Sequence, residues 1–95
     1  MPIKVLIKKE IYDEINRFPS DLNNRIRGVL KELETTWPMS RLDIKKLKGF
    51  DNHYRIRVGD YRILFLRESG TAKIYDVSHR RDVYKRKDNF YAKNE

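Results

Sequence analysis

The sequence contains no cysteine, so neither a disulfide nor a thiolate metal site can stabilise the fold. No apolar run approaches the roughly 20 residues that a membrane-spanning helix needs. The N-terminal stretch MPIKVLIKKEIYDEI also lacks the long apolar region and the small-residue cleavage site of a signal peptide. These absences favour a reducing compartment, and we expect a cytoplasmic protein with no membrane partner.

Internal repeats, low-complexity stretches and interdomain linkers are also missing from the 95 residues. A chain of this length predicts one domain that spans residues 1–95. Because so small a domain buries only about 60–65% of the surface that its unfolded chain exposes, its core will be thin. Its stability can therefore depend on a partner.

Positive charge is abundant and unevenly distributed. The chain has 22 Lys and Arg against 14 Asp and Glu, a net charge of +8. Residues 1–40 carry a net charge of only +1, whereas residues 41–87 hold 14 basic and 6 acidic residues. A cluster of this kind predicts a phosphate-binding surface and favours nucleic acid as a partner. The alternative is a solvated basic surface without a ligand.

The first half of the chain predicts one strand and two helices. The apolar, β-branched residues 3–7 predict a strand. Ile11, Ile15 and Phe18 follow at helical spacing, and the proline at position 19 makes this first helix short. Because few residues separate it from the next helix, we expect an antiparallel helix hairpin.

Ser20 is suited to cap the N-terminus of the second helix. The apolar residues of this helix fall on one stripe: Leu22, Ile26, Val29, Leu30, Leu33 and Trp37. Gly28 costs the helix about 1 kcal/mol relative to alanine. We expect this glycine to be tolerated because it lets another backbone approach closely.

The second half predicts a basic connection, residues 40–53, and then a sheet. His53 is expected to be a solvated loop residue at the end of that connection. Three strands follow, at about residues 54–58, 61–67 and 72–79. The fold class is therefore α+β: an N-terminal strand, an antiparallel helix hairpin, and a three-stranded antiparallel meander that completes a twisted four-stranded sheet.

The stretch YRIRVGDYRI, residues 54–63, fixes a register if residues 59–60 form a two-residue turn. Three apolar pairs then share one face: Val58 with Tyr61, Ile56 with Ile63, and Tyr54 with Phe65. The same register places Arg57 opposite Arg62 and Arg55 opposite Leu64 on the other face. The apolar face is expected to pack on the helices.

Like charges that face each other destabilise a sheet by about 0.2–1 kcal/mol, which suggests that an anion belongs between them. The alternative is that twist and water separate the two arginines at little cost. In the last strand, Tyr75 and Val77 are expected to face the core. Their neighbours then lie on the arginine side: Asp76, Ser78 and Arg80.

The stretches LKGFDNHYRIRVGDYRILF and IYDVSHRRDVY resemble the RelE toxins of the RelE/ParE superfamily of type II toxin–antitoxin systems. The resemblance covers roughly residues 3–84 and extends to the order of the predicted elements. It implies a RelE-like fold and a ribosome-dependent mRNA endonuclease toxin that cuts in the ribosomal A site. Such an enzyme needs no metal or other cofactor, and a cognate antitoxin holds it inactive.

Several residues match functional positions of the family. Arg55 and Arg57 fall where well-studied members have two lysines. Arg62 matches the arginine after the hairpin turn, and Arg80 matches the arginine after the last strand. Tyr84 matches a tyrosine that stacks on an mRNA base. Arginine is effectively always protonated, so it is a poor general base.

Metal-free cleavage by the 2′-OH needs a proton acceptor, a proton donor and positive charge at the phosphorane-like transition state. We assign that charge to Arg57 and Arg62, because a guanidinium can hold two phosphate oxygens. Arg80 can do the same or donate a proton. His79 is the nearby group whose ordinary pKa suits proton transfer at neutral pH. A half-buried structural histidine is its alternative, because His79 starts on the core side with Val77.

Tyr84 is expected to stack on a base, a contact worth about 1–3 kcal/mol, or else to close the core as a packed aromatic. The remaining basic candidates are assigned to the RNA backbone: Lys46, Lys48, Arg55, Arg81 and Lys85. Each of these alone is equally consistent with a solvated basic rim. Carboxylates such as Asp60 and Asp76 lack the spacing of a metal site, so no metal is expected.

Two other functions remain open. A ParE-like member would poison DNA gyrase by binding, without cleaving RNA, and such proteins generally lack the full basic cluster. A catalytically inactive, basic RNA- or ribosome-binding protein is the other possibility. The combination of Arg57, Arg62, Arg80 and Tyr84 favours the mRNA-cleaving toxin.

Overall fold

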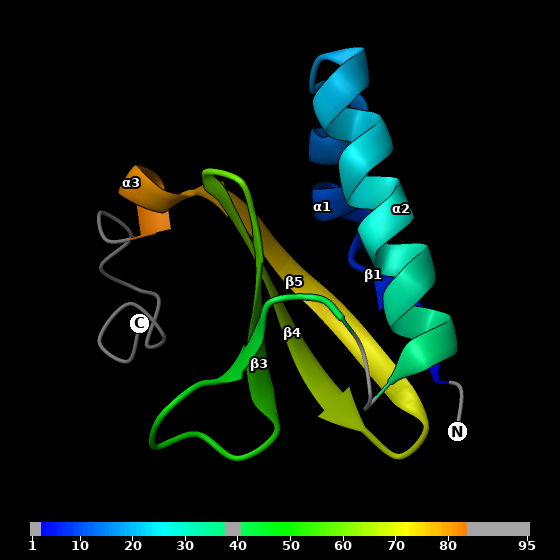
Figure 1. The fold of residues 1–95 in the computed structure, drawn as a ribbon, viewed down its shortest axis with the longest axis vertical. Coiled ribbons are helices and arrows are strands. Elements are labelled where there is room, and N and C mark those ends of the chain that lie inside the picture. Colours follow the sequence, from blue (N-terminus) through cyan, green and yellow to red (C-terminus); the bar gives the residue numbers. More distant parts are fainter. Residues whose placement is uncertain (1–2, 38–40, 84–95) are drawn as a thin grey trace.

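The structure, a computed structural model, describes residues 3–37 and 41–83 and shows one five-stranded sheet with two helices on one side (Figure 1). In chain order the elements are β1 (Lys4–Ile7), α1 (Lys9–Asn16), α2 (Ser20–Thr36), β2 (Ile44–Lys46), β3 (His53–Val58), β4 (Tyr61–Glu68), β5 (Thr71–His79) and α3 (Arg80–Val83). The predicted α+β fold and its element order are confirmed. The sheet has one strand more than predicted, because β2 lies inside the stretch that was expected to be a loop.

The strands are ordered β1-β5-β4-β3-β2, with β1 parallel to β5 and the other pairs antiparallel. The outer edge of β1 is covered by the end of α2. There the backbone N–H of Val5 donates to the Glu34 carboxylate at 3.0 Å, and the N–H of Ile3 donates to the Glu34 carbonyl at 3.1 Å. Satisfying these outward donors protects the edge from pairing with another chain.

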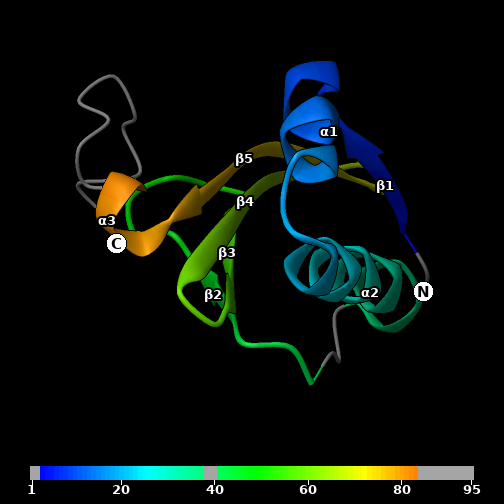
Figure 2. The ribbon, with the colours of Figure 1, turned by 90° about the horizontal axis from the view of Figure 1, so that it is seen from above.

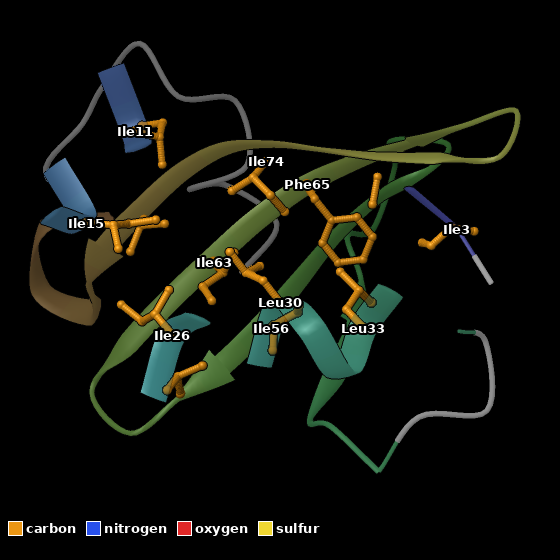
Figure 3. Packing of buried hydrophobic residues seen from close by; sticks show 13 residues of the cluster. Ile3, Ile11, Ile15, Ile26, Leu30, Leu33, Ile56, Ile63, Phe65 and Ile74 are labelled. Atoms are coloured by element: carbon orange, nitrogen blue, oxygen red, sulfur yellow. The ribbon is translucent and has the colours of Figure 1, made fainter. Parts of the chain in front are cut away.

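The hydrophobic core lies between the helices and the sheet face toward them, here called the helix-side face (Figures 2 and 3). Its centre includes Phe65 and Ile63 of β4 and Ile26 and Leu33 of α2, all fully buried. Phe65 stacks on Tyr54 with ring centroids 5.3 Å apart. This core covers one face of the sheet only, which leaves the opposite face for another role.

Two expectations for α2 are wrong. The helix begins at Ser20 itself, and Pro19 is the N-cap, with no side-chain capping bond. Proline favours the extended conformation found there (φ −55°, ψ 152°), and its carbonyl accepts the N–H of Asn23 at 2.9 Å. Gly28 is exposed, and a Cβ built on it would meet no atom within 4 Å. No close backbone approach therefore explains this glycine.

The predicted pairing of β3 with β4 is confirmed at every position, from Tyr54 opposite Phe65 to Val58 opposite Tyr61. Gly59 in the turn has a φ of +57°, a conformation that glycine adopts without the strain of a Cβ. The same pairing confirms that Arg57 lies directly opposite Arg62.

The prediction for β5 is correct for Val77 and wrong for Tyr75. Asp76 pairs with Leu64 but Ile74 pairs with Phe65, so Tyr75 is an extra residue without a cross-strand partner of its own. Such a bulge shifts the alternation of side chains by one position. Ile74 and Val77 therefore both enter the core, whereas Tyr75 packs with Leu47 and Leu64 on the opposite face.

Candidate functional site

The sheet face opposite the helices, here called the arginine face, carries two rows of cross-strand neighbours. The first row runs Ser78, Arg62, Arg57, and the second runs Asp76, Leu64, Arg55, Lys45. Cross-strand neighbours have Cβ atoms about 4.5–5.5 Å apart. Four basic side chains thus start from one small area, and the predicted placement of Asp76 and Ser78 on this face is confirmed.

Arg57 and Arg62 form the centre of the first row. The Arg57 side chain is exposed, and it forms no ion pair within residues 3–37 and 41–83. Its backbone N–H donates to the Asp43 carbonyl at 3.0 Å, which fixes the strand edge beside it. The half-buried Arg62 donates from a guanidinium nitrogen to the Tyr61 carbonyl at 3.3 Å. Two facing guanidinium groups of this kind can hold one phosphate from both sides.

Arg55 in the second row has a different environment. Its side chain is only 13% exposed, and one guanidinium nitrogen lies 3.7 Å from a carboxylate oxygen of Asp43. This ion pair neutralises part of the charge that the sequence assigned to RNA binding. Arg55 therefore fits the rim of an anion site better than its centre.

The alternation of side chains along β2 places Lys45 and Lys46 on opposite faces of the sheet. Lys46 pairs with Tyr54 and so starts on the helix-side face, whereas Lys45 pairs with Arg55 and starts on the arginine face. Lys45 was not among the predicted site residues. Its alternation with Ile44 would have identified it, but only if residues 44–46 had been recognised as a strand. Lys48 is exposed in the loop after β2.

Arg80 begins α3 beside the β3–β4 turn, at the sheet end where Arg57 and Arg62 lie. Its backbone N–H donates to the Asp60 carbonyl at 2.7 Å. Its Nε lies 3.9 Å from the Asp60 carboxylate, and both side chains are more than half exposed. An exposed pair at this distance contributes little free energy, so an anionic ligand can compete for the guanidinium. Arg81 is also exposed.

His79, the last residue of β5, does not lie on the arginine face. It pairs with Tyr61 and packs against that ring edge-on, with centroids 5.3 Å apart. Its Nδ1 accepts the backbone N–H of Arg81 at 3.2 Å. The two remaining predicted site residues, Tyr84 and Lys85, lie outside the described residues.

A small second cluster lies on the arginine face, where Leu47 and Leu64 are buried against Tyr75. The prediction that His53 is a solvated loop residue is wrong. His53 begins β3, is half-buried, and its Nδ1 lies 3.0 Å from the hydroxyl of Tyr75. Burial lowers the pKa of His53 below its ordinary value of 6.5.

Tyr75 and Asp76 are adjacent acids in this cluster. Burial, together with the Asp76 carboxylate, raises the pKa of Tyr75 well above its ordinary value, so the phenol stays protonated. Asp76 itself is 1% exposed and accepts the hydroxyl of Ser78 at 2.9 Å. The arginine face therefore contains a buried carboxylate as well as its basic side chains.

Within residues 3–37 and 41–83, no three His, Cys, Asp or Glu side chains gather in a way that could hold a metal ion. None of the helices described there is both long and apolar enough to cross a bilayer.

Comparison with known proteins identifies the family. The model of the family "ParE toxin of type II toxin-antitoxin system, parDE" matches residues 7–84. Toxin RelE3 of Methanocaldococcus jannaschii is 36% identical over 84 residues, which cover 86% of this chain and 96% of that protein.

Two solved complexes contain chains with the same fold. One is the RelB–RelE antitoxin–toxin complex from Methanococcus jannaschii, at 33% identity and a TM-score of 0.72, covering 84% of this chain and 95% of that one. The other is the archaeal RelE–RelB complex from Pyrococcus horikoshii OT3, at 27% identity and a TM-score of 0.71, covering 84% and 97%. The chain therefore belongs to the RelE family of toxins of type II toxin–antitoxin systems, within the RelE/ParE superfamily.

Proposed function

We propose that this toxin is a ribosome-dependent mRNA endonuclease that cleaves by attack of the 2′-OH on the adjacent phosphodiester, without a metal. The observation that carries the proposal is the pair Arg57 and Arg62, directly opposite each other on the sheet face that points away from α1 and α2. Like charges in that position oppose folding unless an anion lies between them. A phosphodiester is the anion that the family membership favours.

In this proposal the arginine face stabilises the transition state. Arg57 and Arg62 hold the phosphate oxygens as negative charge develops on them, which is often the largest single contribution to catalysis. Arg80 leaves its exposed pair with Asp60 and contacts the leaving side of the phosphate. Lys45, Lys48, Arg55, Arg81 and Lys85 contact the RNA backbone, and Lys46 does so from the edge of the sheet.

Proton transfer needs a group that can exchange a proton at neutral pH. His79 stays the proposed group, because β5 ends at this residue and the chain turns into α3 there. Its ring stands beside Tyr61, so a change in side-chain rotamer has to bring it around the strand end. Tyr84, outside the described residues, is proposed to stack on the base next to the cleaved bond.

We further propose a cognate antitoxin as the regulatory partner. The toxins of both similar solved structures are in complex with RelB antitoxins. The net charge of +8 makes an acidic segment a suitable partner, because opposite charge speeds association and selects the partner. Covering the arginine face would block RNA and remove the repulsion between its arginines.

The test is translation of a defined mRNA on purified ribosomes with the protein present, followed by mapping of the new 5′ ends. Cuts in register with the codons, seen only when ribosomes are present, are the expected result. Arg17→Ala serves as the matched control for variants of the arginine face and should cleave like wild type, because this exposed arginine lies after α1 on the helix side. Intact mRNA at toxin concentrations that stop growth would contradict the proposal.

A ParE-like inhibitor of DNA gyrase is the second candidate, and two observations favour it. The matching family model is described as that of the ParE toxin, and His79 lies on the helix-side face, away from Arg57 and Arg62. Inhibition of gyrase-catalysed supercoiling, with mRNA left intact on ribosomes, would select this candidate over the endonuclease.

A further inference from the structure

Three aromatic side chains meet on the arginine face, beyond the second row. The rings of His53 and Tyr75 have centroids 5.6 Å apart, and those of Phe50 and His53 have centroids 6.0 Å apart, both close to edge-on. All three are half-buried, so each keeps part of its surface in solvent. We call Phe50, His53 and Tyr75 the aromatic platform.

The backbone fixes the platform in place. The β5 bulge turns Tyr75 out of the core and onto the buried pair Leu47 and Leu64. The loop before β3 closes with the Leu47 N–H donating to the His53 carbonyl at 2.8 Å. Gly49 (φ 85°) and Asn52 (φ 65°) allow its tight turns.

The platform is uncharged in a basic surrounding. Burial disfavours the imidazolium form of His53, and both burial and Asp76 disfavour the tyrosinate form of Tyr75. Arg55 follows His53 on the same face, and exposed Lys48 lies in the loop that carries Phe50. Neutral rings beside cations suit a ligand that has both a flat apolar part and phosphates.

We propose that the aromatic platform is a nucleobase-binding subsite for single-stranded RNA, occupied by a nucleotide near the cleaved phosphodiester. RNA as the ligand rests on the proposed function. Successive residues on one face of a strand are about 6.6–6.8 Å apart, so Arg57 lies about 13 Å along β3 from His53. A base on the platform thus belongs to a nucleotide on the same sheet face as the phosphate held by Arg57 and Arg62, and stacking on the platform is tolerant of base identity.

Fluorescence anisotropy with two RNA probes tests this subsite. One probe is a ten-nucleotide oligouridylate, and the other has the same backbone without bases. Wild type is expected to bind the oligouridylate at least about fivefold more tightly, since one stacked base contributes about 1–3 kcal/mol. Phe50→Leu and Tyr75→Leu are expected to reduce this preference, whereas stacking on Tyr84 is left in place. They should keep the wild-type salt dependence, which reports phosphate contacts.

Tyr12→Leu is the matched control, because Tyr12 is a 45% exposed aromatic residue of α1, and α1 lies on the helix side of the sheet. It should keep the full preference for bases. A preference that is undiminished in both platform variants, or no measurable binding of either probe by wild type, would overturn the inference. Variants that lose antitoxin binding but keep the RNA preference would also overturn it, since the platform would then bind a peptide.

The cleavage assay on ribosomes separates this inference from the proposed function. Codon-spaced cleavage by wild type, with an unchanged base preference in Phe50→Leu, would reject the subsite and leave the endonuclease standing. A base preference that depends on the platform, in a protein that cuts no mRNA, would reject the endonuclease and retain the subsite.

Discussion

The two faces of the sheet are built from the same strands but have opposite compositions. The helix-side face contributes to a large apolar cluster that includes residues of β1, α1, α2, β3, β4 and β5. The arginine face has only a small cluster around Leu47 and Leu64, beside facing like charges and a buried carboxylate. The free energy of folding thus comes mainly from one face, which lets the other face carry like charges opposite each other.

The largest expected effect is on the helix-side face. Phe65→Ala removes a fully buried ring that stacks on Tyr54, and should lower the free energy of unfolding by about 3–5 kcal/mol. Urea denaturation followed by circular dichroism measures this loss. Leu6→Ala, at a 38% exposed residue of β1, is the control and should change stability by less than about 1 kcal/mol. Equal losses in the two variants would show that the proposed division between the faces is wrong.

On the arginine face, Arg62→Ala and Arg80→Ala should each reduce cleavage on ribosomes at least about tenfold, equivalent to about 1.4 kcal/mol of transition-state stabilisation. Removal of Arg62 should change stability by less than about 1 kcal/mol, because the lost repulsion from Arg57 offsets the lost hydrogen bond to the Tyr61 carbonyl. Initial rates and urea midpoints measure the two effects. Wild-type rates in both variants would remove these residues from the site.

A smaller effect is expected in the helix layer. Gly28→Ala should stabilise the protein by about 0.8–1 kcal/mol, because Gly28 lies within α2 with open space where a Cβ would be. Thermal unfolding measures it, and cleavage should not change. Gly59→Ala is the contrasting variant, since its φ of +57° should make the same substitution destabilising. A loss of stability in Gly28→Ala would indicate a packing role for this glycine.

The smallest effect concerns pH. The pKa of His53 is lowered in the folded state, so the unfolded state takes up a proton first as the pH falls through 6.5. The stability that neutral His53 contributes is therefore present above that pH and declines below it. His53→Gln should flatten the fall in melting temperature between about pH 7 and pH 5. An unchanged slope in His53→Gln would mean that other groups govern it.

The pairing of β3 with β4 could be predicted from sequence because a single turn determines its register. Gly59 with Asp60 allows a two-residue hairpin, and the alternation of residues 54–58 then fixes which side chains share a face. The facing pair Arg57 and Arg62 followed from that register. Strand β2 was missed because three residues are too few to show an alternating pattern of their own.

Other parts of the site depend on contacts that local patterns do not contain. A one-residue bulge moved Tyr75 to the arginine face, and nothing in TAKIYDVSH marks where the extra residue falls. His53 is held by Tyr75, a residue far along the chain. Likewise, Asp43 can form its ion pair with Arg55 only because β2 lies beside β3.

The strand order has a consequence for synthesis of this toxin. Strand β5 lies between β1, from the very start of the chain, and β4, so it joins segments that leave the ribosome at very different times. Pairings across so long a stretch of chain form slowly, because the chain loses conformational entropy on closing the loop before favourable contacts can form. Until β5 pairs with β4, Arg62 does not have Ser78 as its cross-strand neighbour. The backbone N–H of Arg80 is then also not bonded to the Asp60 carbonyl in the β3–β4 turn. The arginine face is thus completed only after β5, the last strand of the chain, has paired with β4.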